Sequence, residues 1–305
     1  MRKRRHRRGY ILVTTVLLIA IAGLLLAGVA RRSLMAALDV KQAQDELQIR
    51  WGEASCQRLV FRRAPFILKK QVESKSLKPK RRDEGEEIPS VEVPIPRRAA
   101  AIELGGIEFQ LQIADEQAKA NLNRVLVERS DEAAIEIMRT LAASSDLPSI
   151  FFRKNKNFDL SPRKAAFESW GQVFESTDTN SVLLAEQLRL STQRLTLWGP
   201  DGKLHFAAAD DETLAEIAKL AISPAEAGKL VEMRAKSPDA LSAQFLNSLG
   251  LNAKKRTKLE SLLTDSSRCY SLWITSKDSA GTVRSKLIVQ DTIDESTKRI
   301  HVSIW

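Results

Sequence analysis

The chain has 305 residues, of which 43% are hydrophobic and 28% are charged, and its formal net charge is +10. This apolar content suffices to bury a core, which excludes an intrinsically disordered protein. Residues 1–32 hold eight lysines and arginines and no acid, and taking these eight from the total of 48 leaves 40 basic residues against 38 acidic ones. The excess charge therefore belongs to the amino terminus and does not indicate a nucleic-acid-binding surface.

The amino-terminal segment combines a basic cluster, a single glycine and a long apolar stretch. Residues 2–8 are basic apart from His6, Gly9 follows, and residues 10–30 contain no charged side chain. As a helix these 21 residues measure about 31 Å, the thickness of a bilayer's hydrocarbon core. Six lysines and arginines precede the stretch and only Arg31 and Arg32 follow it closely. This asymmetry predicts a cytoplasmic amino terminus, with residues 31–305 on the other side of the membrane.

Three interpretations of this segment differ in where the chain is cut. The segment can be interpreted as a plain single-pass anchor, as a secretory signal peptide cut after Ala30, or as a class III leader cut between Gly9 and Tyr10. The apolar stretch is longer than the core of most signal peptides. Residues 31–50 contain no glycine or proline, so the span is expected to continue as an extended helix over 10–61. A class III leader is cut before the apolar stretch and so keeps the helix in the mature protein. The expected long helix therefore favours this interpretation.

Residues 62–98 differ in composition from their surroundings, with a basic block, an acidic block and spaced prolines. We expect a flexible or extended linker, because such a segment has little to bury. No aromatic residue lies among its charges for base stacking, so a solvated tether is preferred over a lipid-binding or nucleic-acid-binding segment.

Strand patterns occur on both sides of the middle of the chain. Residues 101–113 predict a β-hairpin with its turn at Gly105-Gly106, and one buried face from 107 onward. Three further strands are expected at 271–275, 282–290 and 299–305, with a turn at 278–281 between the first two. Because early and late strands are expected in one sheet, the segment between them is an insertion.

The segment 125–265 is predicted to be that insertion, a compact all-α subdomain. Helices are expected at 131–141, 162–173, 211–220, 224–235, 238–249 and 253–263, with Gly250 as a C-cap. The sequence therefore predicts an α+β fold, with a long transmembrane helix and an antiparallel sheet whose strands at 99–124 and 266–305 flank a helical insertion.

The chain has few histidines and cysteines from which a catalytic set could be built. The histidines are His6, His205 and His301, and no nucleophile and base have a recognisable spacing, so we expect no enzyme and no cofactor. Residues 199–202 predict a turn, not a phosphate-binding loop. The only cysteines, Cys56 and Cys269, are too few for a disulfide framework or a zinc site. One bridge between them is an alternative to the expected separate thiols.

Some polar clusters admit both a structural and a functional interpretation. Residues 210–212 are expected to begin a helix rather than to bind a metal. Asp291, Asp294 and Glu295 offer oxygen ligands to Ca²⁺, but without EF-hand spacing. Residues 229–263 also resemble a helix-hairpin-helix DNA-binding unit, an interpretation that an extracytoplasmic location opposes.

Three motifs occur in order along the chain: RRG/Y at 7–10, IADEQAKANLN at 113–123 and LLTDS at 262–266. Together they resemble the K-type minor pseudopilins of bacterial type II secretion systems. The phrase at 113–123 supplies Asp115, Glu116, Asn121 and Asn123. From their residue types alone, both asparagines are expected to order a loop through side-chain-to-backbone hydrogen bonds.

The resemblance implies a pilin-like fold and a role in protein export. A prepilin peptidase would cleave after Gly9 and methylate the amino terminus of Tyr10. The subunit would lie in the inner membrane with most of its chain in the periplasm, and would cap the tip of the pseudopilus beside other minor pseudopilins. Most pilin-like subunits carry a glutamate at the fifth mature position, which the K type lacks, and here that position is Thr14.

The sequence departs from the family in three places. The phrase GKLHFAAAD at 202–210 lacks the asparagines expected there, Tyr10 is an unusual first residue, and the linker is long. These departures bear on any ion site more than on the resemblance itself. The alternatives are a single-pass anchored extracytoplasmic binding protein and a tip minor pilin of a related type IV pilus.

Overall fold

A computed structural model describes most of the chain, in two units. The described residues are 5–73, 90–129, 131–142, 150–152, 167–176, 181–236, 241, 243–277, 281–292 and 298–304. The units are Met1–Trp51 and Gly52–Trp305, and helix α1 (Arg5–Ile67) runs through the boundary between them. We call the second unit the head unit.

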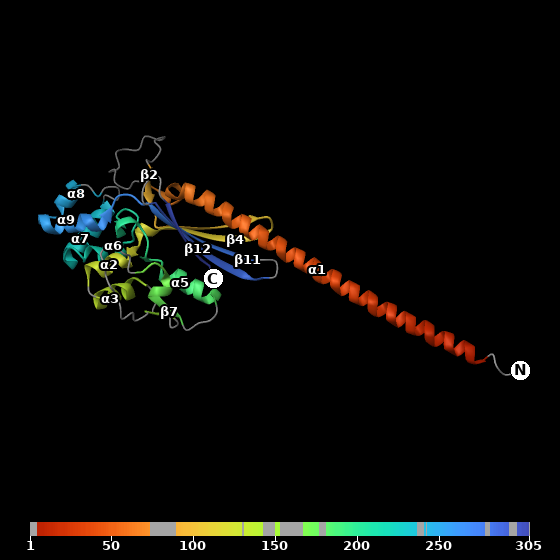
Figure 1. The fold of residues 1–305 in the computed structure, drawn as a ribbon. Helices are drawn as coiled ribbons and strands as arrows, with labels where there is room; N and C mark the ends of the chain where they lie inside the picture. Colours follow the sequence, from red (N-terminus) through yellow and green to blue (C-terminus); the bar gives the residue numbers. More distant parts are fainter. Residues whose placement is uncertain are drawn as a thin grey trace, which may run out of the picture. The chain divides into compact units, whose positions relative to one another are not determined.

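The first unit is the amino-terminal part of α1 (Figure 1). The helix from Tyr10 onward is long and apolar enough to cross a membrane, and its most apolar stretch is not buried by other parts of the protein. Leu24, for example, is 75% exposed. Such exposure of aliphatic side chains is suited to lipid and costly in water.

The helix extends beyond its expected end at 61. It continues to Ile67 with Pro65 in its last turn, where a proline interrupts only the end of the hydrogen-bond ladder. Strand β1 (Lys69–Glu73) follows and pairs with β2 (Ser90–Pro94). The stretch expected as a linker therefore contains ordered elements at both ends, because backbone pairing does not depend on a hydrophobic composition. Residues 74–89 lie outside the described part.

The head unit contains a five-stranded antiparallel sheet with the order β13-β12-β11-β4-β3 (Figure 1). The strands are β3 (Arg97–Leu104), β4 (Ile107–Asp115), β11 (Cys269–Lys277), β12 (Val283–Thr292) and β13 (Lys298–Ile304). Strand β4 pairs directly with β11, which confirms that early and late strands share one sheet. Of the turn expected between β11 and β12, residues 278–280 lie outside the described part.

The hairpin of β3 and β4 is confirmed in its turn and its pattern. Gly105 and Gly106 have φ angles of 62° and 80°, as a two-residue type I′ turn requires. Along β4, Phe109 and its neighbours two residues away are buried, whereas Glu108 and Gln110 are exposed. The sheet thus has two different faces.

The face that carries Phe109 packs against the part of α1 that belongs to the head unit. A Cβ atom added to Gly52 would lie 2.2 Å from Cζ of Phe109, so the helix backbone touches the ring directly. Lys286 on β12 forms an ion pair with Glu53 at 3.0 Å. The glycine is needed because only a residue without a Cβ permits this close approach.

Between β4 and β11 lies a block of helices with a large hydrophobic core. Its elements are η1 (Glu116–Ala118), β5 (Ala120–Asn121), α2 (Leu122–Glu128), α3 (Asp131–Leu141), β6 (Ile150–Phe152), α4 (Trp170–Val173), β7 (Phe174–Ser176), α5 (Ser181–Ser191), β8 (Leu195–Thr196), η2 (Pro200–Gly202), β9 (Leu204–His205), α6 (Asp211–Ala218), α7 (Pro224–Lys236), α8 (Ala243–Ser248), α9 (Ala253–Leu262) and β10 (Leu263–Thr264). Figure 1 shows α6 to α9 grouped together.

The block differs from an all-α subdomain. Short strand pairs β5-β8, β6-β7 and β9-β10 connect its loops, because those loops carry buried backbone groups that need partners. Helices α3, α6, α7 and α9 match the predicted segments, and helices α2 and α5 were not predicted. Of the helix expected at 162–173, residues 162–166 lie outside the described part and only Trp170–Val173 is helical. The helix expected at 238–249 is described as α8 alone, and Gly250 beyond it has a φ of 69°, as a C-cap requires.

The contact between Gly52 and Phe109 predicts the effect of one methyl group. Gly52→Ala should destabilise the protein by about 1–3 kcal/mol, because the added carbon overlaps a fully buried ring. Gly228→Ala on α7 is the control: it meets no atom within 4 Å and should gain about 0.5–1 kcal/mol from helix propensity. Denaturant unfolding in detergent measures the stability of both variants. Equal gains in stability for Gly52→Ala and Gly228→Ala would contradict the close packing of Gly52 on Phe109.

The hydrogen bonds of Glu226 at the start of α7 predict a contribution to stability that is lost at low pH. Glu226 accepts hydrogen bonds from Lys255 and from Ser223, which lower the pKa of Glu226 to about 2 from its ordinary value of 4.5. A depressed carboxyl pKa stabilises the fold above about pH 4.5, and this contribution is lost as the pH falls toward 2. The difference in unfolding midpoint between the wild type and Glu226→Gln should therefore disappear near pH 2. Glu232→Gln, at an exposed position on the same helix, is the matched control variant.

Candidate functional site

The residues singled out by the sequence fall in two places. Gly9, Tyr10 and Thr14 lie in the first turns of α1, and Tyr10 is 72% exposed. The hydroxyl of Thr14 donates to the backbone carbonyls of Tyr10 (3.0 Å) and Ile11 (2.9 Å). Its polar group is therefore satisfied within the helix, so threonine costs little in an apolar environment.

In the head unit, Asp115 lies at the end of β4, where the sheet meets the helical block. Its Oδ1 accepts hydrogen bonds from the backbone N–H groups of Gln117 (2.9 Å) and Ala118 (3.2 Å) and from Ser267 Oγ. Its Oδ2 lies 2.7 Å from Nδ1 of His205 on β9. The residue is only 2% exposed, so these contacts replace its lost hydration.

Glu116 is buried beside it and makes a separate set of contacts. Its Oε1 accepts from Lys119 Nζ and from Ser271 Oγ on β11, and its Oε2 accepts from Thr196 Oγ1 on β8. Lys119 is itself only 7% exposed. The ion pair of Glu116 with Lys119 brings no net charge into the core. We define the Asp115 cluster as the seven residues Asp115, Glu116, Lys119, Thr196, His205, Ser267 and Ser271.

The asparagines of the same phrase order the next loops, as expected from their residue types. Asn121 caps α2 by accepting from Arg124 N–H at 3.0 Å, and its amide donates to the Trp198 carbonyl. Asn123 donates to the carbonyls of Phe167 and Leu197 and accepts from Phe167 N–H. The two side chains thus hold two loops, one at Phe167 and one at 197–198, against the start of α2.

The geometry of the Asp115 cluster is that of a structural junction. Ser267 and His205 both bind the carboxylate, so the acid lies between them, whereas a serine nucleophile needs the imidazole in the middle. Nearby Cys269 is buried, and desolvation, together with the negative charge of Glu116, raises the pKa of its thiol well above the usual range. A thiol with a raised pKa is a poor nucleophile.

Sequence reasoning identified Asp115 and Glu116 but none of their side-chain partners. Thr196, His205, Ser267 and Ser271 follow them by 80 to 155 positions. The only local signal was Lys119, three residues after Glu116. No pattern in the sequence links the others.

The acidic residues at 210–212 begin α6, as expected. Asp210 accepts from the Thr213 N–H at 2.8 Å, while Arg194 and Arg234 form ion pairs with the carboxylates. Asp291 on β12 has a raised pKa because burial disfavours its charged form. Asp294 and Glu295 lie outside the described residues, and the described part contains no group of three side chains that could hold a metal ion.

Two of the three cations at 254–256, which supported the helix-hairpin-helix interpretation, form ion pairs within the head unit. Lys255 forms an ion pair with Glu226 at 2.8 Å, and Arg256 lies 3.7 Å from Glu260. Cys56 and Cys269 are both free and buried, as expected for separate thiols. The turn at 199–202 is a 3-10 turn without a following long helix, so it does not cradle a phosphate.

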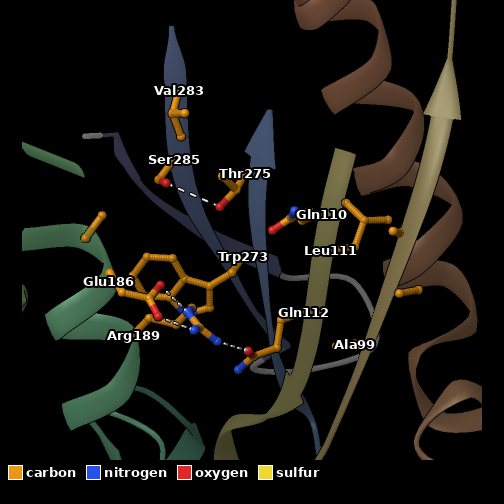
Figure 2. Close-up of a pocket in the computed structure, with 13 residues that line it drawn as sticks. Ala99, Gln110, Leu111, Gln112, Glu186, Arg189, Trp273, Thr275, Val283 and Ser285 are labelled. Carbon is orange, nitrogen blue, oxygen red and sulfur yellow. Dashed lines mark hydrogen bonds and ion pairs between the residues drawn. The ribbon is translucent and has the colours of Figure 1, made fainter. Parts of the chain in front are cut away.

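An open groove of about 590 Å³ lies between α5 and the sheet face opposite Phe109 (Figure 2). Trp273 and Thr275 of β11 form part of its floor, and Glu186 and Arg189 of α5 form one wall. Arg189 forms an ion pair with Glu186 on the same helix and donates to Gln112 on β4 at 2.7 Å. The bond to Gln112 attaches the wall of the groove to its floor. We call this the α5 groove.

No protein-family model matches the chain, and no curated protein matches it either.

The Asp115 cluster predicts a graded loss of stability. Asp115→Leu should destabilise the protein by about 3–5 kcal/mol, because it leaves several buried donors without an acceptor. Asp115→Asn should cost less, since it keeps one oxygen. Asp265→Leu, at an exposed position, should change stability by less than about 0.5 kcal/mol. Denaturant unfolding measures the series, and a loss no larger for Asp115→Leu than for Asp265→Leu would contradict this role.

Proposed function

We propose that this protein is a K-type minor pseudopilin of a type II secretion system. In this role it is cleaved after Gly9, methylated at Tyr10, retained in the inner membrane by α1, and placed at the tip of the pseudopilus, where it helps to start assembly for protein export. The observation that carries the proposal is the start of α1: glycine directly before an uncharged apolar helix that has Thr14 in place of a glutamate.

Thr14 supports the tip position through the cost of an unpaired charge. A glutamate in the apolar stretch is useful only where it meets the amino terminus of a neighbouring subunit, because a lone carboxylate in hydrocarbon is expensive. Thr14 carries no charge, and its hydroxyl is bonded within its own helix. A subunit with nothing ahead of it in the filament has no use for the acid.

The head unit supports the proposal through its chain order. A hairpin beginning at Arg97 is followed by a block of helices, and the closing strands β11 to β13 return to the same sheet. The phrase at 113–123, which carried the resemblance, lies at the point where the chain leaves the sheet, and its carboxylates hold the return strand through Ser267 and Ser271. The shared motif thus has a physical reason to be present in a fold of this kind.

Processing of the amino terminus tests the proposal. Mass spectrometry of protein purified from membranes of cells with a prepilin peptidase should find a mature chain that starts at a methylated Tyr10. Gly9→Leu should abolish this processing, because the enzyme would act at the glycine. Gly28→Leu, in the same helix and with no neighbour within 4 Å, should be processed normally.

The other outcomes identify the alternatives. An intact amino terminus in the wild type would favour a plain anchored binding protein, and a mature chain that starts at Arg31 would indicate a signal peptide. Normal processing in cells with a type IV pilus and no type II secretion genes would favour a tip minor pilin.

A further inference from the structure

Strand β3 is an edge of the five-stranded sheet and adjoins the α5 groove. Among the described residues no strand pairs with its outer side. Seven of its eight residues are exposed, and three of them, Ala99, Ala100 and Ala101, also line the groove. An open sheet edge and a neighbouring pocket are the two parts that strand-addition sites combine.

The backbone of β3 presents unpaired groups in a defined pattern. The Pro96 carbonyl accepts from Asp115 N–H at 2.8 Å, and Arg97 then lies opposite Ala114. Antiparallel pairing alternates by two residues, so the even-numbered positions of β3 bond to β4. The N–H and C=O groups of Arg97, Ala99, Ala101 and Glu103 therefore point away from the sheet.

The middle of this edge lacks the features that usually prevent strand pairing. Natural edges are protected by charges, prolines, bulges or short strands. Strand β3 has eight residues, and its centre at 99–101 consists of three alanines. An added strand could approach this centre without meeting a charge or a large side chain.

The two ends of β3 carry opposite charges on one face. Arg97 bonds only to the neutral side chain of Gln193, so no acid compensates its charge among the described residues. Glu103 lies directly opposite Glu108, a like-charge pair that is unfavourable, and Lys277 on the next strand lies beside Glu108 only. An added strand that brings an acid to Arg97 and a base to Glu103 would satisfy both ends.

The same face leads into the α5 groove. Ala99 and Ala101 share this face with Gln110, Thr275 and Trp273. Residues of an added strand that lie opposite these two alanines would point to the groove side, because directly opposed residues of a sheet share a face. The groove is open and has an aromatic side chain at its floor, which suits side chains of medium size.

We propose that the outer edge of β3 binds an extended segment of another polypeptide as a sixth, antiparallel strand. The segment carries a base and, six residues later, an acid, with two apolar residues between them that point to the α5 groove. The base lies opposite Glu103, the acid opposite Arg97, and the apolar residues opposite Ala101 and Ala99. The inference does not rest on the proposed function, since it concerns only the head unit.

Binding of a synthetic peptide to the detergent-solubilised full chain tests the proposal. The probe has nine residues, with lysine second, valine fourth and sixth, glutamate eighth and threonine elsewhere; the control peptide exchanges the lysine and the glutamate. Fluorescence anisotropy should give a Kd below about 1 mM for the probe. The control should bind about tenfold more weakly, because both charge pairs become repulsive.

Two variants separate strand addition from other modes of binding. Ala101→Pro removes an outward N–H while leaving the bonds to β4, and should weaken the probe at least about tenfold. In the double variant Arg97→Glu/Glu103→Arg the preference between the two peptides should invert, so that the control peptide binds better than the probe. A misfolded head unit would bind neither peptide. Failure of the wild type to bind the probe, equal binding of both peptides, or a dimer that protects β3 without peptide would overturn the proposal.

Discussion

The burial of two adjacent carboxylates, Asp115 and Glu116, is the constraint on which the head unit depends. They lie where β4 ends, so the chain cannot leave the sheet without placing both charges in the core. Each accepts several hydrogen bonds, and the donors outside their own turn come from β8, β9, β11 and the segment before β11. Satisfying the two acids therefore joins the helical block to the returning strands, and removal of these partners leaves buried carboxylate oxygens with fewer donors.

The two faces of the sheet are closed by different physical means. On one face Gly52 brings the α1 backbone against the ring of Phe109, and the ion pair of Glu53 with Lys286 joins the same helix to the sheet. On the other face α5 is held by Arg189, which bonds to Gln112, and the contact leaves an open groove. This groove leaves access to the sheet beside β3.

Local patterns carried most of what could be predicted. The apolar stretch from Tyr10, the Gly105-Gly106 hairpin and the helix at 131–141 follow from composition, turn chemistry and periodicity. Predictions failed where the pattern was weak or misleading. Helix α5 was not predicted although residues 177–180, Thr-Asp-Thr-Asn, include preferred N-cap types, and the polar composition of 62–98 concealed the pairing of β1 with β2. Backbone hydrogen bonds formed the β1-β2 pair, and the hydrophobic pattern did not report it.

The sequence by itself determined the kind of chain this is: one apolar helix at the amino terminus, a sheet made of early and late strands, and helices between them. It also singled out Asp115 and Glu116 as members of the phrase at 113–123. Only the tertiary structure decided what these acids do, because their partners Thr196, His205, Ser267 and Ser271 are brought near them by the fold. Periodicity records which face of an element is buried, whereas hydrogen bonds between distant residues depend on how the elements pack, which no local pattern encodes.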